Sequence, residues 1–305
     1  MKEHSNDRDK AEQSAHQRKN RGKGRAKKVW GVIGTIMLAG VLTMAIFVGI
    51  FMTYINKSLK GHVEVDMSEY DRKVSTELYR LGTDGETWEM YQTLFSDENR
   101  IWVDFDSIPK NLRNATIAIE DKRFESHHGV DWHGTVRAVF RTLTNGNTQG
   151  GSTITQQLIK NLTQYDDVTV KRKVIEIFRA LQFDKDYTKE TTLEWYLNFI
   201  WLGDRCRGVG AAAMNYFGKP VQELTLAECA SLISITNNPT IYGPYSDAVF
   251  TNSETGEQKT ARDKNKERQE LVLWSMLDQG YITQEEYDEA VAQELVFVRA
   301  EGEEA

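Results

Sequence analysis

The chain has 305 residues, of which 40% are hydrophobic and 27% charged, and its formal net charge is −7. This composition is ordinary for a globular protein with one large or two modest domains and names no function by itself, while two cysteines are too few for a disulfide framework. The charge is unevenly distributed, because residues 1–28 hold ten Lys or Arg against four Asp or Glu, whereas residues 56–305 hold 28 against 41.

Residues 29–55 separate these two parts with 27 positions that carry no charge. A helix of that length, at about 1.5 Å per residue, exceeds the roughly 30 Å hydrocarbon core of a bilayer. A cleaved signal peptide would have an apolar region of only about 7 to 15 residues, so we predict an uncleaved, single-pass transmembrane helix. The basic residues before it predict, by the positive-inside rule, a cytoplasmic N-terminus and an external location for everything from Asn56 onward.

The segments on either side of the predicted span lack a strong helical pattern. Residues 1–28 are polar and predict a disordered, basic cytoplasmic tail that sets the topology and could also bind anionic lipid headgroups. Residues 56–99 form a membrane-proximal segment. Here and just beyond, HVEVDM (62–67) and RIWVDF (100–105) alternate in polarity around the turn GTDGE (82–86), which predicts a few short strands or extended segments.

Helical periodicity begins near Pro109 and predicts one mainly α domain over residues 100–295, followed by a short tail, 296–305. Thr225 and Thr283 each stand three residues before a glutamate. A threonine and a glutamate at this spacing fit a capping box, in which each side chain satisfies the other residue's backbone N–H. The two boxes predict helices over about 226–236 and 284–294.

Turn-forming residues are frequent between these two helices, and residues 237–266 therefore predict an exposed loop. The two cysteines, Cys206 and Cys229, both lie in the external part of the chain, where they could form a disulfide with each other or remain buried thiols.

The stretch IEDKRFESHHGVD, residues 119–131, combines four acids, two bases and two histidines. Such a mixture suits a solvated charge cluster, a metal site built on histidine, or a carboxylate that moves a proton beside cations holding an anion. Metal-binding histidines usually stand at helical spacing or beside cysteines. Because His127, His128 and His133 fit neither pattern, we do not expect zinc.

The stretch GGSTITQQLIKN, residues 150–161, predicts a tight turn followed by a helix with Ser152 as its N-cap. At 100° per residue, Thr153, Gln157 and Lys160 share one polar face of this helix. Apolar residues occupy the opposite face: Ile154, Leu158, Ile159 and Leu162. Taken alone, this pattern also describes a helix with a solvated face.

The stretch VKRKVIEIFRALQF, residues 170–183, divides in the same way. Arg172, Glu176 and Arg179 line one face, where such ion pairs contribute only a few tenths of a kcal/mol on an exposed helix. The opposite face predicts an apolar stripe that packs on the core: Val170, Val174, Ile177, Phe178 and Leu181. On its own this stretch favours a structural role.

The order of these stretches carries more information than any one of them. Followed by TLEWYLNFIWLG (192–203) and GVGAAAMNYFGK (208–219), they resemble the ordered motifs of the peptidoglycan glycosyltransferase family, the polymerising domain of class A penicillin-binding proteins and of monofunctional transglycosylases. The resemblance covers roughly residues 100–295. It implies a mainly α, lysozyme-like glycosyltransferase domain preceded by a single transmembrane helix, at the outer face of a bacterial cell membrane.

The resemblance also implies a reaction. Such enzymes polymerise lipid II, a disaccharide-peptide on undecaprenyl pyrophosphate, into β-1,4 glycan strands by inverting transfer from a donor still attached to its lipid pyrophosphate. The implied partners are lipid II, the nascent lipid-linked glycan, the membrane and the cell-wall synthesis machinery, with no nucleic acid. We further expect an apolar surface between residues 56 and 91 that helps to collect a lipid substrate.

Site residues follow from the motif positions. The resemblance implies that Glu120 is the general base and that Asp121, Phe124 and His127 support the first motif within the substrate site. Glu176 is implied as a second catalytic residue that associates with the pyrophosphate or with a divalent cation, Mg²⁺. The remaining matches are expected to contact the donor's sugar and pyrophosphate: Ser152, Thr153, Gln157, Lys160, Arg172 and Lys173.

Physical chemistry explains why these residue types suit the implied reaction. A sugar hydroxyl is too weak an acid to ionise at neutral pH, so a carboxylate must take its proton as the new bond forms. Pyrophosphate leaves without being protonated, so cations or a metal must absorb its charge. A glycosidase needs instead a protonated carboxyl at the leaving oxygen. A lysozyme-like lytic hydrolase and a membrane-anchored scaffold with little activity remain the alternatives.

The sequence departs from the family pattern at two positions. Lys122 stands where the first motif often has arginine and keeps the charge. Val168 stands where some members have another arginine, so one pyrophosphate contact is either missing or supplied by Lys171. Because no Ser-x-x-Lys motif of a transpeptidase follows the domain, both a monofunctional protein and the front part of a bifunctional one remain open.

Overall fold

The computed structural model describes residues 30–50, 53, 67, 76–81, 88–94, 99–145, 150–163, 170–251 and 255–299. The chain divides into two compact units, residues 1–62 and 63–305, which are described separately. The predicted tail at residues 1–28 and, apart from Met67, the stretch HVEVDM lie outside the described residues. Most of the apolar surface expected between residues 56 and 91 lies outside them as well.

The first unit contains the helix Trp30–Ile50, which is long and apolar enough to cross a membrane and has a mean hydropathy of 2.3. Two of its threonine hydroxyls donate to backbone carbonyls of the preceding turn, Thr35 to Gly31 and Thr43 to Ala39, each over 2.8 Å. These hydroxyls are thus satisfied within the helix, as a hydrocarbon environment requires. The helix coincides with most of the predicted span.

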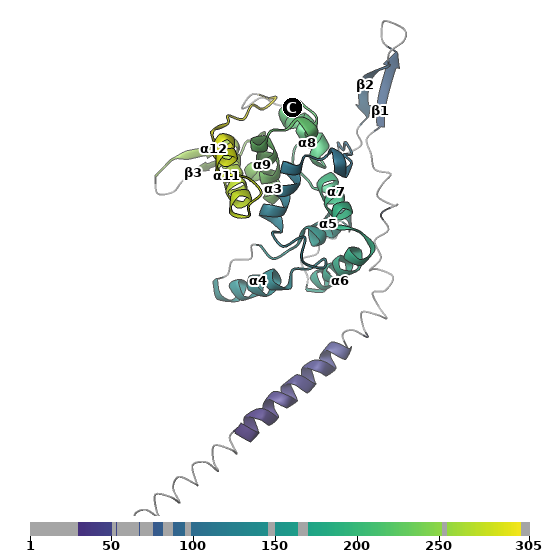
Figure 1. Cartoon of the computed structure of the whole chain (residues 1–305), viewed down its shortest axis with the longest axis vertical. Helices are drawn as coiled ribbons and strands as arrows, with labels where there is room; N and C mark the ends of the chain where they lie inside the picture. Colours follow the sequence, from purple (N-terminus) through teal and green to yellow (C-terminus); the bar gives the residue numbers. More distant parts are fainter. Residues whose placement is uncertain are drawn as a thin grey trace, which may run out of the picture. The chain divides into compact units, whose positions relative to one another are not determined.

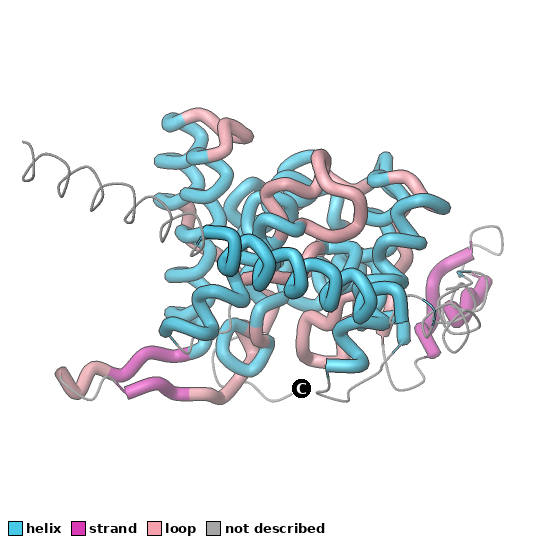
Figure 2. Tube along the Cα trace, turned by 90° about the horizontal axis from the view of Figure 1, so that it is seen from below, coloured by secondary structure: helices cyan, strands magenta, loops and turns pink. Residues whose placement is uncertain are grey.

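The second unit is built almost entirely from helices, drawn in cyan in Figure 2, as the mainly α prediction requires. They are α3 (Lys110–Glu120), α4 (Trp132–Asn145), α5 (Ile154–Thr163), α6 (Val170–Asp186), α7 (Lys189–Phe199), α8 (Val209–Phe217), α9 (Leu226–Ser234), α10 (Pro239–Tyr242), α11 (Ala261–Asp278) and α12 (Gln284–Ala292), with the short 3-10 helices η2 (Phe105–Ser107), η3 (Val221–Glu223) and η4 (Ile235–Asn237).

These helices pack in two groups that share one core. In the first group α11 contacts α3, α9 and α12, and in the second α5 contacts α6 and α7. Fully buried side chains from both groups, such as Leu112 of α3, Leu158 of α5, Tyr196 of α7 and Leu232 of α9, belong to a single hydrophobic cluster. In Figure 1, α4 and α6 lie at the lower end of this body, away from α8.

In the described part of the chain, strands form two antiparallel pairs. β1 (Thr76–Leu81) pairs with β2 (Trp88–Leu94) on either side of the predicted turn GTDGE, and β3 (Val249–Thr251) pairs with β4 (Gln258–Thr260). The stretch RIWVDF forms no strand but is extended at Asp104 (φ −66°, ψ 151°), in keeping with the alternative of an extended segment. The Asn198 side chain occupies both backbone groups of Val103, accepting from its N–H and donating to its carbonyl over 2.8 Å each, so no neighbouring strand pairs there.

Both predicted capping boxes are confirmed, at Thr225 before α9 and at Thr283 before α12. The exposed loop predicted over residues 237–266 is wrong over most of its length, because α10, the β3–β4 hairpin and the first turns of α11 fall within it. Two local signals explain these elements. Asn238 caps α10 with Pro239 at its first position, and Thr260 begins α11 with a third capping box.

Helix α6 corrects a further prediction. Its most buried residues are Glu176, Ala180 and Phe183, whereas the predicted apolar stripe, represented by Val174 and Phe178, is only half-buried. The charged side of the helix therefore turns inward at Glu176. The periodicity identified the two faces of the helix correctly, but the prediction that the apolar face packs on the core was wrong.

The two cysteines, Cys206 and Cys229, are both buried and free. Of the two alternatives that the sequence left open, the structure therefore has separate buried thiols. Burial raises the pKa of the Cys206 thiol to about 12 and also raises that of Cys229, so both remain protonated and unreactive at neutral pH.

Candidate active site

Glu120 ends α3, and both of its carboxylate oxygens accept hydrogen bonds. Nε2 of Gln157 in α5 donates to Oε2 over 2.8 Å, and the hydroxyl of Thr236 in η4 lies 2.7 Å from Oε1. The hydroxyl of Tyr196 in α7 donates to Oε1 of Gln157 over 3.3 Å, which leaves the amide nitrogen facing Glu120. Segments far apart in the sequence thus fix one carboxylate.

Tyr196 is well suited to orient this amide. Burial raises the pKa of its phenol well above the ordinary value, and the negative charges of Glu120 and Asp121 raise it further. The phenol therefore stays protonated and remains a donor to Gln157.

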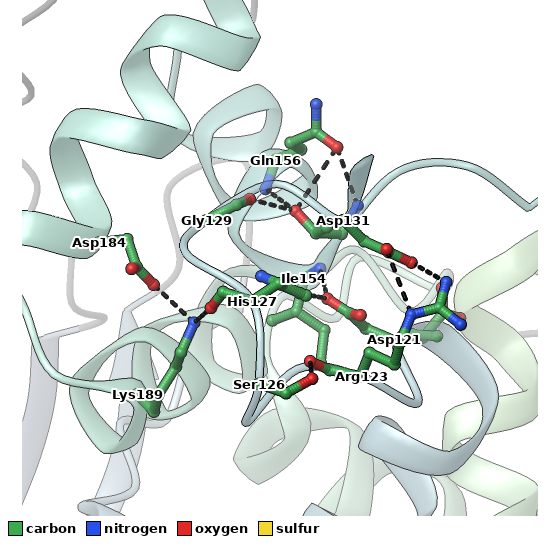
Figure 3. A network of polar contacts seen from close by, with 12 residues as sticks. Asp121, Arg123, Ser126, His127, Gly129, Asp131, Ile154, Gln156, Asp184 and Lys189 are labelled. Atoms are coloured by element: carbon green, nitrogen blue, oxygen red, sulfur yellow. Dashed lines mark hydrogen bonds and ion pairs between the residues drawn. The ribbon is translucent and has the colours of Figure 1, made fainter. Parts of the chain in front are cut away.

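Asp121 is buried and connects the first predicted motif to the second. Its Oδ2 accepts from Nε2 of His127 over 2.7 Å and from the backbone N–H of Ile154 over 3.0 Å (Figure 3). Ile154 is the first residue of α5, and the first N–H groups of a helix have no partner within it. Asp121 consequently fixes the start of α5 next to Glu120.

Thr153, and not the predicted Ser152, caps α5. The N–H of Gln156 donates to the Thr153 hydroxyl oxygen over 3.2 Å, and the N–H of Thr153 donates to Oε1 of Gln156 over 3.0 Å, which makes a capping box. The Thr153 hydroxyl donates in turn to the Gly129 carbonyl over 2.7 Å (Figure 3). The exposed Ser152 hydroxyl is therefore available for other contacts.

The loop that carries Gly129 packs tightly on α6. Gly129 has φ +72°, and a Cβ there would lie 2.2 Å from the Ala180 carbonyl oxygen, so both the conformation and the close approach require glycine. Lys189 braces the same loop, since its ammonium donates to the His127 carbonyl over 2.7 Å and to Asp184 over 2.5 Å (Figure 3).

A cavity of about 360 Å³ opens beside Glu120 and is lined by residues of α5, α6, α7 and η4. Within it Lys173 donates to the Ser152 hydroxyl over 2.9 Å and forms an ion pair with the buried Glu176. Six of the predicted site residues line this cavity: Ser152, Gln157, Lys160, Arg172, Lys173 and Glu176. Three cations in one concave site suit a ligand with concentrated negative charge.

A second cavity, of about 200 Å³, shares Ser152 with the first and has Glu120 in its wall. Its lining includes Lys122, Arg123, Arg137 and Arg141. Glu120 therefore lies where both cavities can be reached, and each cavity carries cations. This arrangement suits two anionic ligands that meet at a single carboxylate.

Asp131 balances part of the positive charge in the second cavity through an ion pair with Arg123 (Figure 3). Burial favours the neutral form of Asp131, but hydrogen bonds from Arg123 and from the Gly134 backbone outweigh it. The pKa of the carboxyl is therefore lowered from 3.8. Asp131 is ionised at neutral pH and holds the Arg123 side chain in place.

The predicted site residues separate into two sets. Asp121, Phe124, His127 and Thr153 are buried and hold the loop and α5 in place, although Asp121 and Thr153 also border the smaller cavity with Glu120. The other six residues line the larger cavity. Their roles toward a substrate stay predictions. Val168 and the side chain of Lys171 lie outside the described residues.

Sequence analysis missed Thr236, Tyr196 and Lys189. Thr236 is the last residue of the predicted helix 226–236, directly before the turn-rich stretch, and nothing local marks it as a site residue. Tyr196 lies within one of the stretches that carry the resemblance, but its position on a buried face gave no reason to single it out. Among the described residues, no group of histidine, cysteine, aspartate and glutamate could hold a metal ion by itself.

Comparisons with known proteins agree with the ordered motifs. The family model described as Transglycosylase matches residues 85–277. Penicillin-binding protein 1A of Clostridium botulinum strain Hall is 39% identical over 215 residues, which are 68% of this chain and 25% of the relative. Penicillin-binding protein 1F of Bacillus subtilis is 38% identical over 247 residues, 81% of this chain and 32% of the relative.

A solved structure is also similar to this chain. The crystal structure of penicillin-binding protein 1A from Haemophilus influenzae covers 74% of this chain with 23% sequence identity and a TM-score of 0.38, and 22% of that protein takes part. The chain thus spans between about a fifth and a third of the length of the proteins named above. Because the family model matches residues 85–277, which are more than half of the chain, the chain belongs to the transglycosylase family.

Proposed function

We propose that this protein is a peptidoglycan glycosyltransferase that polymerises lipid II into β-1,4 glycan strands. The observation that supports this proposal most strongly is the placement of Glu120, a carboxylate held by Gln157 and Thr236 at the junction of two cation-lined cavities. Membership of the transglycosylase family supports the reaction class.

The proposed chemistry uses the larger cavity for the donor. Lys160, Arg172 and Lys173 hold the pyrophosphate that links the growing glycan to its lipid, and their positive charge stabilises it as it leaves. The acceptor hydroxyl of lipid II attacks the anomeric carbon from the opposite side, and Glu120 takes the proton of that hydroxyl as the bond forms. The displacement inverts the anomeric carbon and yields a β-1,4 link.

A divalent cation such as Mg²⁺ fits this site only in part. Mg²⁺ is commonly bound by one or two carboxylates together with substrate phosphates and water. Glu176 could supply one such carboxylate from the wall of the larger cavity, although it is paired there with Lys173. The cation, when bound, would neutralise charge on the pyrophosphate, a function that Lys160 and Arg172 perform from the protein side.

Hydrolysis is less well supported by the same geometry. A hydrolase of this kind needs a protonated carboxyl at the leaving oxygen. Asp121, the neighbour of Glu120, is buried, and its Oδ2 accepts from both His127 and the backbone of Ile154, so this oxygen is committed to structure.

The experiment that tests the proposal incubates the full chain in detergent with labelled lipid II and resolves the products by size. Wild type should give a ladder of glycan strands, and Glu120→Gln should give none, because the amide cannot accept the proton; we expect a loss of about 10²–10⁴-fold. A chelator arm measures dependence on divalent cations. Soluble fragments released from preformed glycan would support hydrolysis, and an equally active Glu120→Gln variant would contradict the proposed base.

A further inference from the structure

The hydroxyl of Thr236 is placed between two acceptors. Its Oγ1 lies 2.7 Å from Oε1 of Glu120 and 2.7 Å from the carbonyl oxygen of Ile233. A hydroxyl has one proton to donate and two lone pairs with which to accept. At any moment it can therefore donate to only one of these two oxygens.

The two possible donations correspond to the two protonation states of Glu120. When the carboxylate is ionised, Thr236 donates to Oε1. When Glu120 carries a proton on Oε1, the carboxyl O–H can donate to the Thr236 oxygen, and Thr236 can donate to the Ile233 carbonyl. Both arrangements use the same heavy-atom positions, so a change of protonation needs only a rotation of the hydroxyl.

The other neighbour of the carboxylate cannot do this. Gln157 presents its amide nitrogen to Oε2, and the Tyr196 hydroxyl on the opposite amide oxygen fixes that orientation. An amide N–H₂ group donates but does not accept. Thr236 is accordingly the contact that can satisfy the protonated form of Glu120.

We propose that Thr236 is a positioning residue that holds the base Glu120 in both its ionised and its protonated form. This inference rests on the proposed function, in which Glu120 accepts a proton in each cycle of glycan extension. Because the site is already satisfied before and after proton transfer, little reorganisation of the surroundings is needed when the proton arrives.

Several other charged and titratable groups face Glu120, and they remain unchanged in the test. From the smaller cavity these are Lys122, Arg123, Asp131, Arg137 and Arg141. Asp121 adjoins Glu120 in sequence, Tyr196 faces it from α7, and the larger cavity adds Lys160, Arg172, Lys173 and Glu176. A shift of the pH profile of activity caused by loss of the Thr236 hydroxyl must therefore be measured against a wild type that contains all of these groups.

The test compares the steady-state kinetics of full-length Thr236→Val and Thr236→Ser on labelled lipid II. Valine keeps the shape but lacks the hydroxyl, so kcat should fall by about ten- to a hundredfold, as expected for a lost hydrogen bond to a charged group. KM should stay within about twofold, and serine should restore most of kcat. A hydroxyl bonds more strongly to the ionised carboxylate, so the acid limb of the Thr236→Val pH profile should move to higher pH.

Thr240→Val is the matched control, because it removes the hydroxyl of an exposed threonine in α10. It should retain wild-type kinetics. If Thr236→Val does not fold by its melting curve, Thr236→Ala gives the same comparison with a smaller side chain.

Three results would overturn the inference. A fully active Thr236→Val variant would show that the hydroxyl is not used, and the bond to Ile233 would then be an ordinary backbone contact. Equal loss of kcat in the valine and serine variants would indicate packing. A wild type that makes no glycan, or an active Glu120→Gln variant, would instead refute the proposed function itself and this inference with it.

Discussion

The acidic side chains around the site differ in the groups that donate hydrogen bonds to them. Asp131 is paired with Arg123, Glu176 with Lys173, and Asp121 with His127 and a helix N-terminus. Glu120, by contrast, is hydrogen-bonded by neutral groups, the amide of Gln157 and the hydroxyl of Thr236. This contrast distinguishes the proposed base from the carboxylates that support it.

The Asp131–Arg123 pair predicts a pH-dependent contribution to stability. Because the pKa of Asp131 is held below 3.8, the pair stabilises the fold fully above that value and loses its effect as pH falls through the lower, folded-state pKa. Asp131→Asn should lower the free energy of unfolding by about 1–2 kcal/mol at pH 7. The difference from wild type should shrink below about pH 4.

Denaturant unfolding of both proteins across this pH range measures the effect. Asp247→Asn, at an exposed aspartate, is the control and should change stability little at any pH. A difference between Asp131→Asn and wild type that stays constant down to pH 3 would contradict the ion pair as its source.

How far the sequence predicts a residue's place depends on how local its contacts are. The capping boxes of Thr225 and Thr283 are local and were predicted. Ser152 was chosen as a cap where Thr153 serves, because a run of polar residues before a helix does not identify which one begins it. The contact of Thr236 with Glu120 spans 116 residues and belongs to no recognisable pattern, so only the folded chain could reveal it.

At the scale of elements, α4 combines two different faces. Gly134, Arg137, Ala138 and Arg141 line the smaller cavity. At 100° per residue, Trp132, Val136 and Phe140 fall roughly on the other side, and all three are exposed. An exposed apolar stripe on a helix that also presents arginines is typical of an element lying in a membrane interface. Among the described residues, this stripe is an apolar surface on a helix that also lines the smaller cavity, and the surface expected between residues 56 and 91 stays a prediction.

The α4 stripe predicts a difference between substrates in bilayers and in detergent. If it contacts lipid, the triple variant Trp132→Ser, Val136→Ser, Phe140→Ser should raise KM for lipid II in proteoliposomes by about three- to tenfold. Activity on lipid II dispersed in detergent should change little, because no bilayer is then involved.

Leu271→Ser with Trp274→Ser is the matched control, since these α11 residues are similarly exposed and do not line either cavity. Equal losses in the bilayer assay for both variants would point to a general effect of removing apolar surface. Such a result would remove the reason to place α4 at the membrane.

The same elements show why helix faces are harder to predict than helices. The stretch 170–183 was correctly predicted as an amphipathic helix, yet Glu176 faces inward and the apolar stripe is half-exposed. Periodicity reports that two faces differ, and the usual assumption places the apolar one in the core. That assumption fails for a helix whose charged face lines a binding cavity.

At the scale of the whole molecule, the site depends on two groups of helices meeting at one point. Glu120 and Thr236 come from α3 and η4 of one group, whereas Gln157, Glu176 and Tyr196 come from α5, α6 and α7 of the other. The motif order in the sequence predicted which stretches meet. It did not predict their geometry, because motif order does not specify a hydrogen bond such as the one from Gln157 to Glu120.

The orientation of the chain in the membrane is the remaining prediction at this scale. The basic residues before the helix Trp30–Ile50 predict a cytoplasmic tail and an external helical body. Because both native cysteines are buried thiols with raised pKa values, cysteines introduced singly elsewhere can be labelled against a low background. The test uses intact cells whose outer layers let small reagents pass, and a maleimide that does not cross the cytoplasmic membrane. This reagent should label Ser107→Cys, at an exposed position of the helical body. The same reagent should label Ser5→Cys only after the cytoplasmic membrane is permeabilised. Labelling of Ser5→Cys in intact cells would indicate the opposite topology, in which the membrane separates the proposed site from an external substrate.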